Sequence, residues 1–296
     1  MFVNKGSELL EVCNKNGLKI WEYTLLEEAD NSGTSKEKVF ENMRQSLKVM
    51  IKSSEEGRKK EVNSVSSLIG GDALKLDKYS KEKKTLTGEF MTKAMARAIS
   101  TSEVNAAMGK IVASPTAGSS GILPATIISA GEKLDKSEDD LVKALFTAAG
   151  VGILISKNAT TAGAEGGCQA ECGSAAAMAS AAVVEMMGGT PKMALDAASI
   201  VIKNILGLVC DPVAGLVEIP CAKRNIAGTV SALTTVDIVM AGVESKIPFD
   251  DSVEAMYKVG KQMPPSLRET ALGGTATTCT GLKLKEKVFG CAGCRK

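Results

Sequence analysis

SAAAMASAAVVEMM, residues 174–187, is dominated by alanine and serine. This composition predicts a buried helix, because small side chains let neighbouring helices approach closely. Aromatic residues make up only 3% of the 296-residue chain. A core so poor in aromatic residues favours packed helices over a β-sandwich, whose strands are rich in aromatic and β-branched residues. We therefore expect a mainly α fold, a compact helical bundle-like domain with a small-residue core and long functional loops.

Helices are expected on both sides of this segment. Thr190 followed by Pro191 is typical of an N-cap with proline at the first helical position, and it opens a helix over KMALDAASIVIKNIL. Ser137 and Asp140 cap an earlier helix that runs toward GVGILIS. Two later helices are expected at about 225–244 and, from a box formed by Asp251 and Glu254, at 252–263.

Residues 1–85 are rich in charge and predict a polar helical lead-in. The segment Thr34–Glu37 is typical of a capping box. The helix that follows it carries one apolar face, formed by Val39, Phe40, Met43, Leu47, Met50 and Ile51. The lysine-rich stretch 58–85 indicates a junction. We therefore expect two units, residues 1–85 and 86–296.

Charge and composition exclude several classes of protein. A formal net charge of +2 argues against a nucleic-acid surface, which needs clustered surplus cations. The longest uncharged run, 111–131, contains Pro115 and Pro124 and predicts a loop plus a buried helix rather than a membrane span. The first residues lack a basic region followed by an apolar core, so we expect a cytoplasmic protein. With no histidine in the chain, it cannot by itself build an imidazole-ligated zinc site or a triad with a histidine base.

Long glycine- or proline-rich breaks separate the predicted helices, and such loops in a compact helical body need something to order them. The four breaks are 114–121, 161–173, 207–224 and 271–281. All of them except 114–121 contain cysteine.

Cys168, Cys210 and Cys221 lie in these loops beside helix ends, where backbone N–H groups can stabilise a thiolate. Cys13, alone in the first predicted helix, is best interpreted as a small buried hydrophobe. Spacings of 42 and 11 residues match neither a ferredoxin nor a zinc ribbon. Zinc, an iron–sulfur cluster and plain buried thiols therefore all stay open at this point.

Four motifs together resemble the iron–sulfur-dependent L-serine dehydratases, and more narrowly the α chain of their two-subunit kind. The resemblance covers roughly residues 85–280 and keeps the order of the family's motifs. The motifs are SPTAGSSGILPA (114–125), GAEGGCQAE (163–171), GLVCDPVAGLVEIPCAKRN (207–225) and RETALGG (268–274).

This resemblance implies roles for individual residues. Cys168, Cys210 and Cys221 take the places of the family's three ligands to a [4Fe–4S] cluster, with one iron left free of protein thiolate. A cysteine near the C-terminus occupies that iron in resting relatives, and the candidates here are Cys279, Cys291 and Cys294. The loop that receives the substrate carboxylate corresponds to Ser114, Thr116, Gly118, Ser119, Ser120 and Gly121.

Four more charged residues are candidates for the same region. Arg224 and Arg268 are interpreted either as carboxylate partners or as bridges between helix ends. Glu165 and Glu171 are expected either close to the cluster or as exposed charges. The base that removes the α-proton is not identified: a serine alkoxide, a lysine with lowered pKa and a group from a partner chain all stay open.

The expected activity is that of an L-serine ammonia-lyase, which forms pyruvate and ammonia in amino-acid catabolism and gluconeogenesis. The iron would act as a Lewis acid for the β-hydroxyl, and residues 86–296 would be the cluster-binding catalytic domain. A separate β subunit is implied, giving a hetero-oligomer without nucleic acid or membrane partners. The alternatives are an iron–sulfur L-cysteine desulfidase on the same scaffold, a non-catalytic cluster-bearing redox sensor, and a structural zinc protein.

Overall fold

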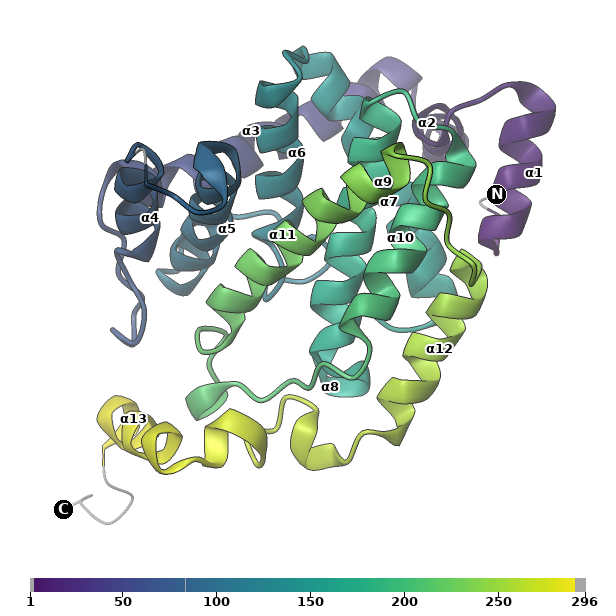
Figure 1. Ribbon diagram of the computed structural model, residues 1–296. Helices are drawn as coiled ribbons and strands as arrows, with labels where there is room; N and C mark the ends of the chain where they lie inside the picture. Colours follow the sequence, from purple (N-terminus) through teal and green to yellow (C-terminus); the bar gives the residue numbers. More distant parts are fainter. Residues whose placement is uncertain (1–2, 83, 291–296) are drawn as a thin grey trace.

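The computed structural model describes residues 3–82 and 84–290. Throughout this part of the chain the regular structure is helical, and strand-like pairing is limited to two isolated bridges. The prediction of a mainly α fold is therefore confirmed (Figure 1). The α-helices are α1 (Gly6–Asn16), α2 (Ile20–Ser32), α3 (Lys36–Lys59), α4 (Asp72–Ser80), α5 (Gly88–Ala106), α6 (Ile122–Lys133), α7 (Glu138–Asn158), α8 (Gly163–Gly166), α9 (Ser174–Met186), α10 (Pro191–Ile205), α11 (Cys221–Met240), α12 (Phe249–Gln262) and α13 (Cys279–Phe289).

Helix α9 is the centre of the fold (Figure 1). Every residue from Ser174 to Glu185 is buried, and the helix packs against α6, α7, α10 and α11. Its alanines are almost completely shielded from solvent, so the close packing predicted from their small size is confirmed.

The predicted helix starts are mostly confirmed. The hydroxyl of Thr190 accepts a hydrogen bond from the N–H of Met193 at the start of α10. In α3 the N-cap is Ser35, which accepts from the N–H of Lys38, one residue after the start of the predicted Thr34–Glu37 box. Ser137 caps α7 as predicted. The six apolar residues predicted to share one face of α3 are all buried or packed against the core. Local capping chemistry was therefore sufficient to place these helices.

The predicted start of the later helix at residue 252 is wrong. Helix α12 begins at Phe249, directly after Pro248. The carboxylate of Asp250, in its first turn, accepts hydrogen bonds from the N–H groups of Gly6 at 2.6 Å and Ser7 at 3.0 Å. This acidic residue therefore stabilises the start of α1, a long-range contact that a local capping pattern does not reveal.

Helices before residue 85 contribute to the main core. Leu9, Ile20 and Leu47 belong to the same buried cluster as Ile127 and Ala176. The division of the chain at residue 85 stays a sequence-based prediction. Within the described ranges, no helix combines the length and the apolar character needed to cross a membrane.

The C-terminal segment crosses one end of the molecule. After α12, two 3-10 turns, Pro265–Leu267 and Gly274–Thr277, lead to α13. In Figure 1 this segment, drawn in yellow, runs along the end where α8 and the start of α11 lie. The loops that carry Cys168, Cys210 and Cys221 are at the same end, which therefore contains the candidate site.

Candidate active site

The Cys168 turn is held by the buried side chain of Gln169. A π-helical turn, Gln169–Gly173, connects α8 to α9. The Gln169 amide nitrogen donates to the carbonyl oxygens of Gly166 at 3.0 Å and Met256 at 2.9 Å, and its oxygen accepts from the N–H of Gly207 at 2.9 Å. One side chain therefore fixes the Cys168 turn to α12 and to the beginning of the Cys210 turn. Gln169 is in the GAEGGCQAE motif, but its role is visible only in three dimensions.

The Cys210 turn is paired with the C-terminal segment. The N–H of Cys210 donates to the carbonyl of Leu267 at 2.9 Å, and the N–H of Glu269 donates to the carbonyl of Cys210 at 2.7 Å. The next residue, Asp211, accepts from the N–H of Thr275 at 2.6 Å. The segment 265–275 thus covers the outside of this turn.

Arg224 holds the Cys210 turn from the inside. Its guanidinium donates to the carbonyl of Val209 at 2.7 Å and pairs with the carboxylate of Asp211 at 2.9 Å. Arg224 therefore bridges the start of α11 and the Cys210 turn, and a role toward a substrate carboxylate stays a prediction. Asp211 is 2% exposed, so it depends on this partner.

The arrangement around Arg268 is looser. One of its nitrogens lies 3.5 Å from the carbonyl of Glu165, and its Nε is buried without a partner among the described residues. The Glu165 side chain is exposed, which is the simpler of its two expected interpretations.

The three predicted ligand thiols are buried and influence one another electrostatically. The hydrogen bond between Cys168 and Cys172 and the positive charge of Arg224 hold the pKa of the Cys168 thiol below its usual range. Burial raises the pKa of Cys221 to about 12, with a contribution from the negative charge of Cys168. Burial and the charge of Glu171 raise that of Cys210. Without an added positive charge, burial therefore opposes the thiolate form of Cys210 and Cys221, and of the three only Cys168 has its pKa shifted toward that form.

Cys172 is a close neighbour whose part the sequence pattern did not indicate. Its sulfur lies 3.3 Å from that of Cys168, one turn earlier. Among the residues that the structure describes, no three cysteine, aspartate or glutamate side chains are arranged to hold a single metal ion. Cys279 is exposed at the start of α13, while Cys291 and Cys294 lie outside the described residues.

The serine-rich loop, residues 114–121, lies against the cysteine turns. The hydroxyl of Thr116 donates to the carboxylate of Glu171 at 2.8 Å, and the other carboxylate oxygen is 3.9 Å from the sulfur of Cys210. Burial raises the pKa of Glu171 to about 7. Glu171, the buried one of the two predicted glutamates, therefore connects this loop to the cysteines.

Most hydroxyls of the serine-rich loop are used within the protein. Ser120 donates to the carbonyl of Ala117 at 2.8 Å, and Ser119 lies 3.2 Å from the hydroxyl of Thr116. Ser114 is the exception, since its buried hydroxyl has no partner in the described part of the chain. The backbone N–H groups of residues 117–119 likewise donate to no described group. The loop therefore keeps several donors available for a ligand.

Non-glycine residues with positive φ occur in the loops of this site. They are Ala214, with φ of 59°, Glu269, with φ of 65°, and Ala271, with φ of 56°. Such backbone is costly for residues with a Cβ and persists where surrounding contacts impose it, often at functional sites.

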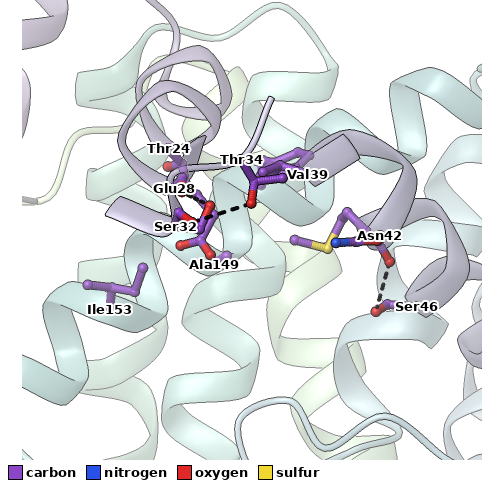
Figure 2. A pocket seen from close by; sticks show the side chains of 11 residues that line it. Thr24, Glu28, Ser32, Thr34, Val39, Asn42, Ser46, Ala149 and Ile153 are labelled. Atoms are coloured by element: carbon purple, nitrogen blue, oxygen red, sulfur yellow. Dashed lines mark hydrogen bonds between the residues drawn. The ribbon is translucent and has the colours of Figure 1, made fainter. Parts of the chain in front are cut away.

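A separate pocket of about 280 Å³ opens between α2, α3 and α7. Figure 2 shows polar side chains of these helices, including Glu28 and Asn42, around it. None of the predicted site residues lines this pocket, so it is distinct from the cysteine turns.

The fold and site define a helical protein in which buried cysteines and a serine-rich loop share one end. The family model described as "Serine dehydratase alpha chain" matches residues 15–276. The chain belongs to this family, and the resemblance stated above is confirmed.

Relatives extend this comparison. "L-serine dehydratase, alpha chain" of Peptoniphilus asaccharolyticus is 49% identical over 283 residues, which are 96% of this chain and 97% of the relative. "Probable L-serine dehydratase, alpha chain" of Bacillus subtilis (strain 168) is 46% identical over 96% of this chain and 94% of the relative. "L-serine dehydratase" of Streptomyces coelicolor is 33% identical over 92% of this chain but only 60% of its own length. The chain is thus similar in extent to the α chains and shorter than the Streptomyces protein.

Proposed function

We propose that this chain is the α chain of an L-serine dehydratase, which forms pyruvate and ammonia from L-serine. Its match to relatives with this name over nearly the full length of both chains carries the proposal. The contact between the serine-rich loop and the Cys168 and Cys210 turns, made through Glu171, supports it from the structure.

The proposal includes a [4Fe–4S] cluster held by Cys168, Cys210 and Cys221. The donor set fits, because such clusters are held by thiolates, and three buried thiols come from three turns at one end of the fold. A cluster spreads its ligands over several irons, so they need not converge on one point as the ligands of a single ion must. Positive iron would stabilise thiolates that burial disfavours. When bound, the cluster would supply a Lewis-acidic iron for the departing β-hydroxyl.

The chain's own residues would bind and orient the substrate. The free N–H groups of residues 117–119 suit a carboxylate, because successive backbone N–H groups in a turn form an anion-binding concavity. Ser114 offers the one hydroxyl of this loop that has no partner among the residues the structure describes. The N–H of Gly121 already donates to Asn225, so Gly121 would shape the loop rather than donate to the substrate.

A separate β subunit would complete the site. The chain has no histidine, and a group from the partner is our preferred source of the base for the α-proton. The greater length of the Streptomyces relative supports a second chain. Assignment of the fourth cluster ligand to Cys279, Cys291 or Cys294 stays a prediction.

The test uses anaerobically purified protein with its partner chain. Cys168→Ser, Cys210→Ser and Cys221→Ser are each expected to lose iron, visible absorption and release of pyruvate from L-serine. Cys13→Ala is the matched control, since Cys13 is equally buried but lies in α1. Variants that keep iron and ammonia production would refute the proposal. Faster pyruvate release from L-cysteine than from L-serine would favour the desulfidase alternative.

A further inference from the structure

The serine-rich loop is attached to α11 by one buried side chain, Asn225, which is 1% exposed. Its amide nitrogen donates to the carbonyl of Gly118 at 2.7 Å and to that of Cys221 at 2.9 Å. Its oxygen accepts from the N–H of Gly121 at 2.9 Å. The side chain thus uses both of its hydrogens and an oxygen lone pair.

Only an amide satisfies these three backbone groups together. Two carbonyls need donors and one N–H needs an acceptor, whereas a carboxylate offers no donor and a hydroxyl offers only one. Because the position is buried, each group left without a partner is costly. The backbone at Gly121 also packs closely against α5, because an added Cβ would collide with the carbonyl of Ala98.

Asn225 holds the serine-rich loop both at the carbonyl of Gly118 and at the N–H of Gly121. The other attachment is the hydrogen bond from Thr116 to Glu171. Between them lie residues 117–119, whose N–H groups have no described partner. In the described part of the chain, Asn225 makes no hydrogen bond with those N–H groups or with a thiol, so it would act on them only through the backbone it holds.

The same side chain reaches the turn of a proposed cluster ligand. Cys221 is the first residue of α11, and Asn225 follows one turn later, on the same face of the helix. We propose that Asn225 is a positioning residue that holds the serine-rich loop in register with the Cys221 turn and so sets the carboxylate-binding backbone. This inference rests on the proposed function.

The first test compares Asn225→Ala with Thr229→Val. Thr229 is also buried in α11, and its hydroxyl donates only to the carbonyl of Asn225 within the helix. Asn225→Ala is expected to raise KM for L-serine by about tenfold or more, with a much smaller change in kcat and unchanged iron content. It should also speed hydrogen exchange in peptides covering 114–121. Thr229→Val should change neither KM for L-serine nor hydrogen exchange in these peptides.

A second variant covers the case in which Asn225→Ala does not fold. Asn225→Asp keeps an acceptor for the N–H of Gly121 but loses both donations, so KM should rise while the Gly121 amide stays protected. In the wild type this amide should exchange as slowly as the core of α11. Fast exchange there, or wild-type KM and exchange in either folded variant, would overturn the inference. If the wild type turns over no serine, the proposed function fails, and the exchange data still decide whether Asn225 holds the loop.

Discussion

The hydrogen bond between Thr116 and Glu171 provides a quantitative test of how the serine-rich loop is attached. Thr116→Val keeps the shape of the side chain and removes the donor to a buried carboxylate. A hydrogen bond to a charged group contributes about 1.5–3 kcal/mol. At pH 8, above the pKa of about 7 to which burial raises Glu171, we expect Thr116→Val to lower the free energy of unfolding by about 2 kcal/mol.

The same substitution in a Glu171→Gln background isolates the contribution of the charge. The amide oxygen still accepts a hydrogen bond, but a neutral one contributes only about 1 kcal/mol. The cost of Thr116→Val should therefore fall by about half, which appears as a coupling energy in a double-mutant cycle. Urea unfolding followed by circular dichroism measures all four proteins.

Thr126→Val is the control for this cycle. Thr126 is fully buried, whereas Thr116 is half-buried, and the Thr126 hydroxyl donates only to the carbonyl of Ile122 within α6. It should cost about 1 kcal/mol or less, whatever residue stands at position 171. If Thr116→Val has the same cost in both backgrounds and matches the control, the Thr116–Glu171 contact does not attach the loop.

Two further predictions concern buried charge. Glu103 is fully buried and accepts from the N–H groups of Asp72 and Ala73, and burial raises its pKa from 4.5 to about 7. The unfolded chain therefore releases the Glu103 proton at a lower pH than the folded protein does. As pH rises from 4.5 to 7, the free energy of unfolding of the wild type should fall by up to about 3 kcal/mol relative to that of Glu103→Gln. Parallel urea titrations that show no such pH dependence would contradict this prediction. Arg224→Gln leaves buried Asp211 without its ion pair and should cost about 3 kcal/mol or more. Lys223→Gln is the control, because it removes an exposed pair with Asp72. It should lower the free energy of unfolding by less than about 1 kcal/mol. If the two substitutions lower it equally, the buried pair between Arg224 and Asp211 is not the cause.

Sequence patterns predicted the parts of the fold that depend on neighbouring residues. The alanine-rich segment of α9 was recognisable from its composition, and the start of α10 from the Thr190 cap. Both signals lie within a few neighbouring residues. The start of α12 was misplaced because the helix begins directly after Pro248, which provides no side-chain cap, so the Asp251 and Glu254 pattern did not mark its first residue. Helix α13 was not indicated, and within it only Gly281 is buried, so it lacks a strong apolar face.

The site was accessible from sequence only as separate motifs. Local residue chemistry marked Cys168, Cys210 and Cys221, and the family resemblance marked the serine-rich loop, but neither showed how they meet. Asn225 and Gln169 stood inside those motifs and received no role, because their partners lie far away in the chain. The sequence shows an amide residue four positions after Cys221, but only the structure shows that this amide is buried and which groups it binds.

The pairing of Cys210 with Leu267 and Glu269 has a consequence for biosynthesis. A ribosome makes the chain from its N-terminus, so every cysteine turn emerges before the segment that closes over one of them. During that interval the Cys210 backbone lacks its later partners, and the nascent protein is open at this end. The cluster proposed for these thiols would therefore have its readiest access to them before translation finishes.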